Sequence, residues 1–337
     1  MPTVGLFRSE ISLGFFSTTT TTTSAGGTPT TLYKRQRPRR SLLSVPGSDP
    51  RKIEKALTLE KNHQQAADAV VLDLEDGVAM DKKIEARQLV TEALQNGDFG
   101  KAEVCVRINA LETGKLALDD MMAILPQPAL QTIVVPKMEH AADVHFVRRL
   151  VHMTTNGSRD IRILGAIESA RGLLNLEEIA QAGTQRSMPS CAYLDALIFA
   201  SEDYCADLEL IRTVPAKEML YARSRLVTVA KAYGLQAIDM VHIDFRNMED
   251  LERECQEGRE MGFTGKQAIH PAQLETIHRS FVPTPKDLEF ARRCVQEYET
   301  ATTTRGKGAC IVDGTVVDAP VYKWAIKLLK RGEQAGL

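Results

Sequence analysis

Ala69-Val70-Val71-Leu72-Asp73-Leu74-Glu75-Asp76-Gly77 is the stretch of sequence from which the fold can be worked out. It opens with a short apolar run rich in β-branched residues and closes on acids and a glycine, which is typical of a buried strand leading into a turn. A longer amphipathic run follows it and predicts a helix. One such unit is a strand followed by a helix, and repeats of it build a parallel sheet covered by helices.

The same unit recurs along the chain from residue 41. The eight predicted strands are Ser41 to Val45, Ala69 to Leu74, Glu103 to Ile108, Thr132 to Pro136, Ile161 to Ile167, Asp195 to Ala200, Ala237 to Val241 and Lys266 to Ile269. An open doubly wound sheet would usually carry a Gly-x-Gly-x-x-Gly turn after its first strand, and Pro46-Gly47-Ser48-Asp49 is not one. Eight strand-helix units within about 250 residues predict an α/β fold, a (β/α)8 TIM barrel over residues 41–283.

Residues 284–337 predict an extension beyond the barrel. A helix is expected from about Lys286 to Thr300, a hairpin within Ala309 to Val317 and a basic final helix from about Tyr322 to Lys330. Within the barrel, by comparison, a helix is predicted from Ala216 to Tyr233, and Gly234 lies just past its end, where a glycine commonly ends a helix. A tail of this kind is expected to act as a lid or as an arm between subunits.

The first 40 residues differ in composition from the rest. They hold six Lys and Arg against one Glu, a net charge of +5, so the whole-chain charge of −2 leaves −7 for the remainder. They also contain an unbroken threonine run from Thr18 to Thr23. This composition predicts a transit peptide that directs the protein to the mitochondrial matrix, with a disordered tail as the alternative.

The overall composition excludes several classes of protein. Lys and Arg number 42 against 44 Asp and Glu, and this balance disfavours nucleic acid or a polybasic membrane surface as a partner. No run of eighteen apolar residues is present, so a transmembrane helix is not expected. The six cysteines include no Cys-x-x-Cys pair, which favours reduced thiols over a zinc site or a disulfide scaffold.

Acids follow several of the predicted strands. The active site of a β/α barrel lies at the carboxyl ends of its strands, and carboxylates gathered there repel one another unless a cation lies among them. The donors are oxygens without accompanying His or Cys, which favours Mg²⁺ or else Mn²⁺ over zinc. Glu168 and Asp203 are the predicted ligands. The alternative for Glu168 is a structural one, capping the next helix or pairing with Arg171.

Other charged residues at strand ends have predicted roles around such a cation. Glu75 and Asp76 are expected to hold metal-bound waters, whereas Asp73 is expected to be a structural acid inside the barrel. Arg107 is suited to bind a carboxylate or stabilise an enolate oxygen, with a salt bridge to one of these acids as the alternative. Lys137 is compatible with Schiff-base chemistry, but the nearby carboxylates favour an ion pair.

An ordered set of motifs gives the chain a resemblance to a known family. The motifs are Arg40 to Gly47, Asp73 to Gly77, Arg107-Ile108-Asn109, Glu168-Ser169, Glu202-Asp203, Gly262 to Pro271 and Asp318-Ala319-Pro320. Together they resemble the citrate lyase β-subunit-like enzymes over residues 40 to 322.

The resemblance implies a Mg²⁺-dependent carbon-carbon lyase acting on a short acyl-CoA, with citramalyl-CoA cleaved to acetyl-CoA and pyruvate. It also implies a homotrimer and a weak malate synthase or β-methylmalate synthase activity. Two alternatives stay open: a metal-independent Schiff-base aldolase using Lys137, and a barrel that binds acyl-CoA without turning it over. Metal dependence would separate the first from the lyase, and a turnover assay would separate the second.

The same resemblance implies roles for individual residues. Glu168 and Asp203 match metal ligands, Arg107 matches the substrate-binding arginine, and Asp318 matches a catalytic acid/base supplied by a neighbouring subunit. The positions matching contacts to coenzyme A and substrate are Ser44, Arg51, Lys55, Lys82, Lys83, Ile84, Glu85, Ala86, Arg87, Ile269 and His270. Two of them depart from the family pattern, because Ser44 replaces an aromatic residue and Arg51 replaces a commoner lysine. A serine cannot cover the face of a coenzyme, whereas the arginine preserves the charge.

Overall fold

The structure is a computed structural model that describes residues 39–59, 66–185 and 192–337. The predicted transit peptide therefore lies outside the described residues, apart from Arg39 and Arg40. The barrel strands are β1 (Ser41–Pro46), β2 (Ala69–Asp73), β3 (Glu103–Arg107), β4 (Thr132–Val135), β5 (Ile161–Ile167), β6 (Ala192–Phe199), β7 (Gln236–Asp239) and β8 (Gly265–Ala268).

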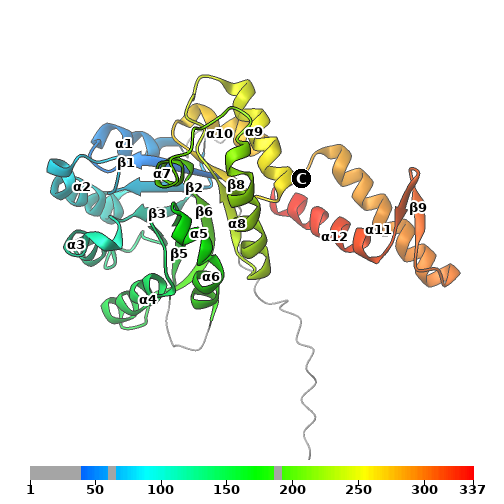
Figure 1. Cartoon of the computed structure of the whole chain (residues 1–337), viewed down its shortest axis with the longest axis horizontal. Coiled ribbons are helices and arrows are strands. Elements are labelled where there is room, and N and C mark those ends of the chain that lie inside the picture. The colour runs from blue at the N-terminus through cyan, green and yellow to red at the C-terminus, as the bar shows by residue number, and fades with distance from the viewer. Residues whose placement is uncertain (1–38, 60–65, 186–191) are drawn as a thin grey trace, which may run out of the picture. The chain divides into compact units, whose positions relative to one another are not determined.

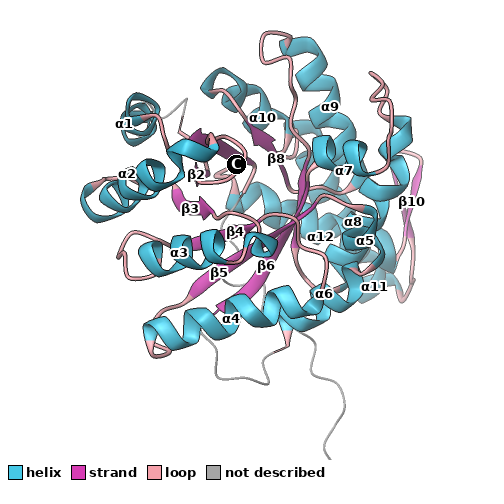
Figure 2. Cartoon of the chain, turned by 60° about the vertical axis from the view of Figure 1, so that its left-hand side comes forward, coloured by secondary structure: helices cyan, strands magenta, loops and turns pink. Residues whose placement is uncertain are grey.

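The eight strands run parallel and close into a barrel in chain order. Closure comes from β1 pairing with β8, where Ser41 lies opposite Lys266 and Leu43 opposite Ala268. Figure 2 shows the strands surrounded by helices. The predicted (β/α)8 barrel is confirmed. The largest difference in strand bounds is in β6, which begins at Ala192 rather than Asp195, ahead of a shift in its register with β5 at Ile163 and Leu164.

The helices of the barrel fill the connections between strands. They are α1 (Pro50–Leu59), α2 (Lys83–Asn96), α3 (Lys115–Ile124), α4 (Ala141–Thr155), α5 (Ala170–Leu174), α6 (Leu176–Thr184), α7 (Ser201–Asp207), α8 (Leu220–Ala232), α9 (Met248–Met261) and α10 (Leu274–Ser280). The helix predicted from Ala216 is a 3-10 turn, Lys217–Met219, continued by α8. Gly234 follows that helix with φ +70°, a left-handed conformation that glycine adopts without strain.

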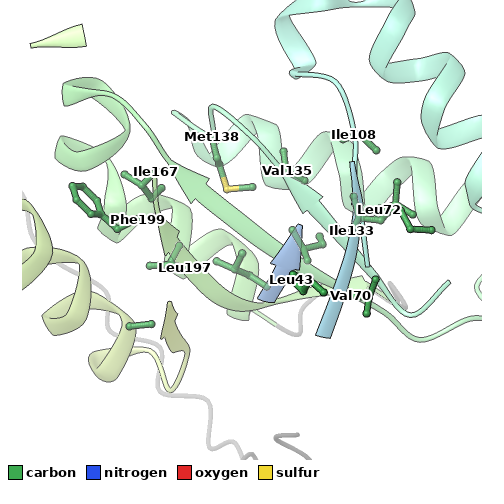
Figure 3. Close-up of a cluster of buried hydrophobic side chains, with 14 of the residues drawn as sticks. Leu43, Val70, Leu72, Ile108, Ile133, Val135, Met138, Ile167, Leu197 and Phe199 are labelled. Carbon is green, nitrogen blue, oxygen red and sulfur yellow. The ribbon is translucent and has the colours of Figure 1, made fainter. Parts of the chain in front are cut away.

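Side chains alternate between the two faces of each barrel strand. One set faces inward and forms a small interior cluster that includes Leu42, Val71, Cys105 and Val134. The other set faces the helices and forms the main apolar core, of which Leu43, Val70, Leu72, Ile133 and Val135 are labelled in Figure 3. Because the alternation continues to the strand ends, Asp73 and Arg107 belong to the inward set.

The residues after the barrel form an extension with its own apolar cluster. It consists of α11 (Pro285–Arg305), the antiparallel pair β9 (Cys310–Val312) and β10 (Thr315–Val317), and α12 (Ala319–Gln334), drawn from orange to red in Figure 1. The predicted hairpin and both predicted helices are present, and each helix is longer than expected. The buried members of the cluster are Ala291, Cys294, Val312, Val317, Ala325 and Leu328. In the described part of the chain, no helix has the length and apolar character needed to cross a membrane.

Ion pairs fill the amino-terminal end of the barrel. The Arg39 Nε atom lies 2.6 Å from Glu103 Oε2, and Arg39 Nη1 lies 2.6 Å from Asp195 Oδ2. Thr132 donates a further hydrogen bond to Glu103. The side chains of Arg39 and Glu103 are fully buried, so removing one partner would leave a desolvated charge behind.

We expect Glu103→Ala to lower the free energy of unfolding by about 3 kcal/mol, because the buried Arg39 guanidinium loses one of its two carboxylate partners and keeps only Asp195. Urea denaturation would measure the change. Lys115→Ala breaks the exposed ion pair of Lys115 with Asp119 and serves as the control, with no measurable change expected. Equal unfolding midpoints for the two variants would contradict the prediction.

Candidate active site

An ion pair between neighbouring strands forms the floor at the carboxyl end of the barrel. Asp73 of β2 lies opposite Arg107 of β3, and the two side chains make paired contacts, Nε to Oδ1 at 2.7 Å and Nη2 to Oδ2 at 2.6 Å. Asp73 also accepts hydrogen bonds from the backbone N–H groups of Glu75 and Gly77. A Cβ on Gly77 would overlap the Asp73 carboxylate, so glycine lets the loop wrap closely around it. Asp73 is a structural acid, as predicted.

Glu75 lies between two cations above this floor. Its carboxylate is 3.1 Å from Arg107 Nη1 and 3.0 Å from Lys137 Nζ, and the residue is buried. Burial raises the pKa of Glu75, and the charge of Arg107 opposes that change. The salt-bridge alternative for Arg107 is therefore present in the structure. The Arg107 side chain nevertheless remains about a quarter exposed.

Lys137 is an ion-pair partner rather than a neutral amine. Burial alone would lower the pKa of Lys137, but its hydrogen bond to Glu75 and the negative charges of Glu75 and Asp76 raise it above the ordinary lysine value. A Schiff base requires the unprotonated amine. The ion-pair interpretation of Lys137 is confirmed, and the structure disfavours the aldolase alternative.

Glu168 is buried without a compensating partner. It follows β5 with 3% of its surface exposed, and its Oε2 atom has no hydrogen-bond partner among the described residues. Burial, together with the negative charges of Glu75 and Asp203, raises the pKa of Glu168 to about 8. Ser169, not Glu168, caps α5 by accepting a hydrogen bond from Gly172 N. The capping alternative for Glu168 is therefore wrong.

These features fit a divalent cation. A buried carboxylate oxygen without a partner, whose charge is opposed by two other carboxylates, becomes favourable when a cation is present. Asp203 lies half-buried in the first turn of α7, and its carboxylate is the second candidate oxygen donor. Among residues 39–59, 66–185 and 192–337, no cluster of three or more His, Cys, Asp or Glu is arranged to hold a metal. Two carboxylates completed by water and substrate oxygens form the donor set that Mg²⁺ prefers.

Two groups of the predicted coenzyme contacts are accessible. Arg51 and Lys55 are exposed on α1, and Ser44 is half-buried on β1, two residues beyond the inward-facing Leu42. Arg51 and Lys55 therefore offer positive charge beside the loop that follows β1.

At Lys82 and along the first turns of α2, the structure corrects the sequence interpretation for three of six side chains. Lys83 donates to the backbone carbonyls of Leu74 and Glu75 at 2.8 and 2.7 Å, and Arg87 Nε pairs with Asp120 at 2.7 Å. Ala86 is fully buried. Lys83 therefore supports the loop after β2, and Arg87 ties α2 to α3, so neither side chain is free to face a ligand. Lys82, Ile84 and Glu85 are exposed, and Lys82 pairs with Glu85.

The loop after β8 is fixed by a residue that the sequence analysis missed. Gln273 is fully buried, and its Oε1 accepts hydrogen bonds from Ile269 N and His270 N at 2.9 and 3.2 Å. The His270 ring stacks on Phe245 with centroids 4.8 Å apart. Pro271 begins the short 3-10 helix (Pro271–Gln273) that carries Gln273. His270 and Gln273 form a capping box at its start, and a glutamine three residues after the cap was the sequence signal that could have identified Gln273.

Asp318 belongs to the extension. It caps α12, and its Oδ1 accepts a hydrogen bond from Val321 N at 3.3 Å. In the described part of the chain, no hydrogen bond or ion pair joins Asp318 to Glu168, Asp203 or Arg107. One copy of the chain thus assembles the carboxylate site without showing the predicted acid/base beside it.

Comparison with known proteins identifies the family. Residues 40–271 match the model of the HpcH/HpaI aldolase/citrate lyase family. The chain is 36% identical over 292 residues to a human protein named citramalyl-CoA lyase, mitochondrial, covering 86% of this chain and 84% of that protein. It is 36% identical over 281 residues to a (3S)-malyl-CoA thioesterase of Cereibacter sphaeroides, covering 83% and 90%.

This chain belongs to the HpcH/HpaI aldolase/citrate lyase family. The solved structure of CitE from Mycobacterium tuberculosis, in complex with magnesium, acetoacetate and coenzyme A, superposes with a TM-score of 0.69 at 29% identity. That match covers 87% of this chain and 98% of CitE. The predicted family and the barrel are both confirmed, and this family member is a carbon-carbon lyase.

The raised pKa of Glu168 predicts how the metal-free protein responds to pH. Between about pH 4.5 and pH 8 the folded state keeps the Glu168 proton that the unfolded chain has lost, so the free energy of unfolding falls as pH rises through this window. With EDTA present, Glu168→Gln should therefore gain about 3 kcal/mol relative to wild type between pH 5 and pH 8. Urea denaturation at both pH values measures this.

Glu92→Gln changes a carboxylate on the exposed face of α2 and is the matched control. It should leave the pH dependence of unfolding as in the wild type. If Glu168→Gln follows the same pH dependence as Glu92→Gln, folding does not raise the pKa of Glu168, and the prediction is wrong.

Proposed function

We propose that this family member is a Mg²⁺-dependent lyase that cleaves citramalyl-CoA to acetyl-CoA and pyruvate in the mitochondrial matrix. The observation that carries the proposal is the buried, unpartnered oxygen of Glu168, which lies in a site shared with Asp203 and Arg107. The name of the human relative supports the substrate and the compartment, and the magnesium and coenzyme A bound by CitE support the cofactor and the acyl-CoA class.

Glu168 and Asp203 are the residues that would hold the cation. When bound, Mg²⁺ would act as a Lewis acid on the hydroxyl and carboxylate oxygens of the substrate, and Mn²⁺ is the alternative ion for the same donors. Glu75 and Asp76 lie around the ligands and, in this proposal, accept hydrogen bonds from coordinated waters. Lys137 and Arg107 limit the repulsion among these four acids.

Arg107 would stabilise the departing fragment. Breaking the carbon-carbon bond leaves a thioester enolate, whose oxygen needs a fixed positive charge beside it. The pairing with Asp73 holds the guanidinium in one orientation, and its partial exposure leaves it open to the site. Arg107 therefore binds the developing oxygen without having to reorganise.

Coenzyme A recognition would use the exposed cations at the barrel mouth. Arg51, Lys55 and Lys82 offer charge for phosphate groups. The stacked rings of Phe245 and His270 offer an aromatic surface beside Ile269 for the adenine side. Ser44 leaves the neighbouring position without such a surface.

Asp318 would protonate the enolate carbon, reaching the site from a neighbouring subunit of a homotrimer. Its position at the start of α12, half-buried and without a cation partner among the described residues, leaves the carboxylate available for proton transfer. In the condensing direction the same group would take a proton from acetyl-CoA, which accounts for the proposed weak malate synthase or β-methylmalate synthase activity.

Pyruvate release from citramalyl-CoA by the purified full chain tests the proposed function. We expect turnover with Mg²⁺ and its loss after EDTA, because the buried carboxylate pair needs a cation. Turnover that survives EDTA would contradict the metal role, and binding of acyl-CoA without turnover would favour the non-catalytic barrel.

Fractionation of cells that express the full chain tests the mitochondrial compartment.

We expect Asp318→Asn to lower kcat by about 100-fold or more, because the amide cannot transfer the proton. Asparagine caps a helix as well as aspartate does, so α12 should remain folded. Asp287→Asn changes the carboxylate of the capping box at the start of α11, which accepts a hydrogen bond from Thr284 N, and should keep wild-type turnover. Full lyase activity in Asp318→Asn would exclude it as the acid/base.

Mixed subunits test where Asp318 acts. If it serves a neighbouring barrel, a trimer assembled from equal amounts of Asp318→Asn and Glu168→Gln chains should recover about a quarter of the active sites, since a site is intact when an unaltered barrel meets an unaltered tail. Recovery near zero would place Asp318 in its own subunit's site.

A further inference from the structure

Lys137 follows β4 in a left-handed backbone conformation, with φ +48°. This conformation is strained for residues other than glycine and persists only where the surroundings impose it. Other non-glycine residues with positive φ include Asn156 just after α4 and Asp313 beside Gly314 in the hairpin, where such a conformation is ordinary. Lys137 instead lies at the carboxyl end of a barrel strand, beside the site.

The left-handed residue breaks the alternation of β4. Val134 faces the barrel interior, whereas Ile133 and Val135 face the helices. Regular alternation would send the side chain of residue 137 outward beneath the helices. Instead, the Lys137 ammonium lies among the acids of the site, 3.0 Å from Glu75 and 3.9 Å from Asp76.

The chain on both sides of Lys137 is held in place. Val135 pairs with Gly165 of β5, and Met138 N donates to Ala166 O at 3.0 Å. The buried Met138 side chain packs where any Cβ on Gly165 would come within 2.6 Å of its sulfur. Figure 3 shows Met138 among the apolar side chains beside Val135. Lys137 is the residue between these fixed points that adopts the strained conformation.

The strained conformation places the Lys137 ammonium beside the carboxylates of the site. Arg107 and Lys137 approach Glu75 from two sides, and Lys137 also faces Asp76 and acts on Asp203 through its charge. Without Lys137, Glu75 and Asp76 would add their negative charge to that of Glu168 and Asp203. A cation would then be held more tightly and by more protein oxygens, which would leave fewer coordination positions for a substrate.

We propose that Lys137 is a positioning residue that keeps Glu75 and Asp76 away from the cation held by Glu168 and Asp203, so that coordination positions stay open for the substrate. This inference rests on the proposed function for its substrate, but its effect on cation affinity stands apart from turnover. The proposal requires that removing the Lys137 ammonium raises the affinity for the cation and lowers turnover.

Mn²⁺ binding, followed by electron paramagnetic resonance of the free ion, and lyase kinetics with citramalyl-CoA test the proposal on the full chain. Lys137→Met should bind Mn²⁺ more tightly, by roughly tenfold, because a positive charge beside the site is gone. The same variant should show a raised KM and a lowered kcat. Lys137→Arg keeps the charge and should stay within about twofold of wild type in Mn²⁺ affinity.

Lys115→Met is the matched control, because Lys115 also pairs with an aspartate but lies exposed on α3. It should leave Mn²⁺ affinity and kinetics unchanged. Lys137→Gly removes the strain together with the charge, so its melting temperature should stay level or rise by about 2 °C while its turnover falls. Glu75→Gln should abolish most of the effect of Lys137→Met on Mn²⁺ affinity in a double-mutant cycle.

Loss of Mn²⁺ affinity and turnover together in Lys137→Met, in step with a lowered melting temperature, would assign Lys137 a merely structural role and overturn the proposal. Wild-type Mn²⁺ affinity in Lys137→Met would overturn it as well. Absence of citramalyl-CoA turnover in the wild type would contradict the proposed function instead, and the Mn²⁺ measurements would still decide the role of Lys137.

Discussion

Side-chain alternation along parallel strands is the constraint on which the rest of this structure depends. In a closed barrel one face of every strand points into a narrow interior, and apolar residues fill the middle of that interior, above the ion pairs at its amino-terminal end. At the carboxyl end the inward positions become charged, and Asp73 and Arg107 lie side by side because their strands are neighbours in register. The site is thus placed by the same geometry that builds the core.

The charges of the site follow from this placement. Burial makes an unpaired carboxylate costly, and the Oε2 atom of Glu168 has no hydrogen-bond partner among the described residues to offset that cost. Arg107 is largely committed to Asp73 and Glu75, and Lys137 to Glu75. The remaining negative charge at Glu168 and Asp203 is what a divalent cation would neutralise. A substrate that supplies oxygen ligands would then complete the coordination.

The extension has a different physical basis. Its two helices and its hairpin enclose an apolar cluster of their own, and its elements lie outside the strand pattern of the barrel. Asp318 gains a fixed position there by capping α12. Because this element lies outside the barrel, the barrel strands do not fix which site the Asp318 carboxylate would serve, and the proposed proton transfer depends on how subunits assemble.

The sequence by itself determined the eight strands, the barrel, the hairpin and the acids at the strand ends, because hydrophobic periodicity and turn residues are local signals. It also identified Asp73 as structural and Lys137 as an ion-pair partner. Only the tertiary structure decided that Lys83 and Arg87 face inward, since the partners that hold them, the carbonyls after β2 and Asp120, lie on other elements. The role of Gln273 and the left-handed turn at Lys137 likewise depend on contacts between neighbouring strands and loops, which a periodic pattern does not encode.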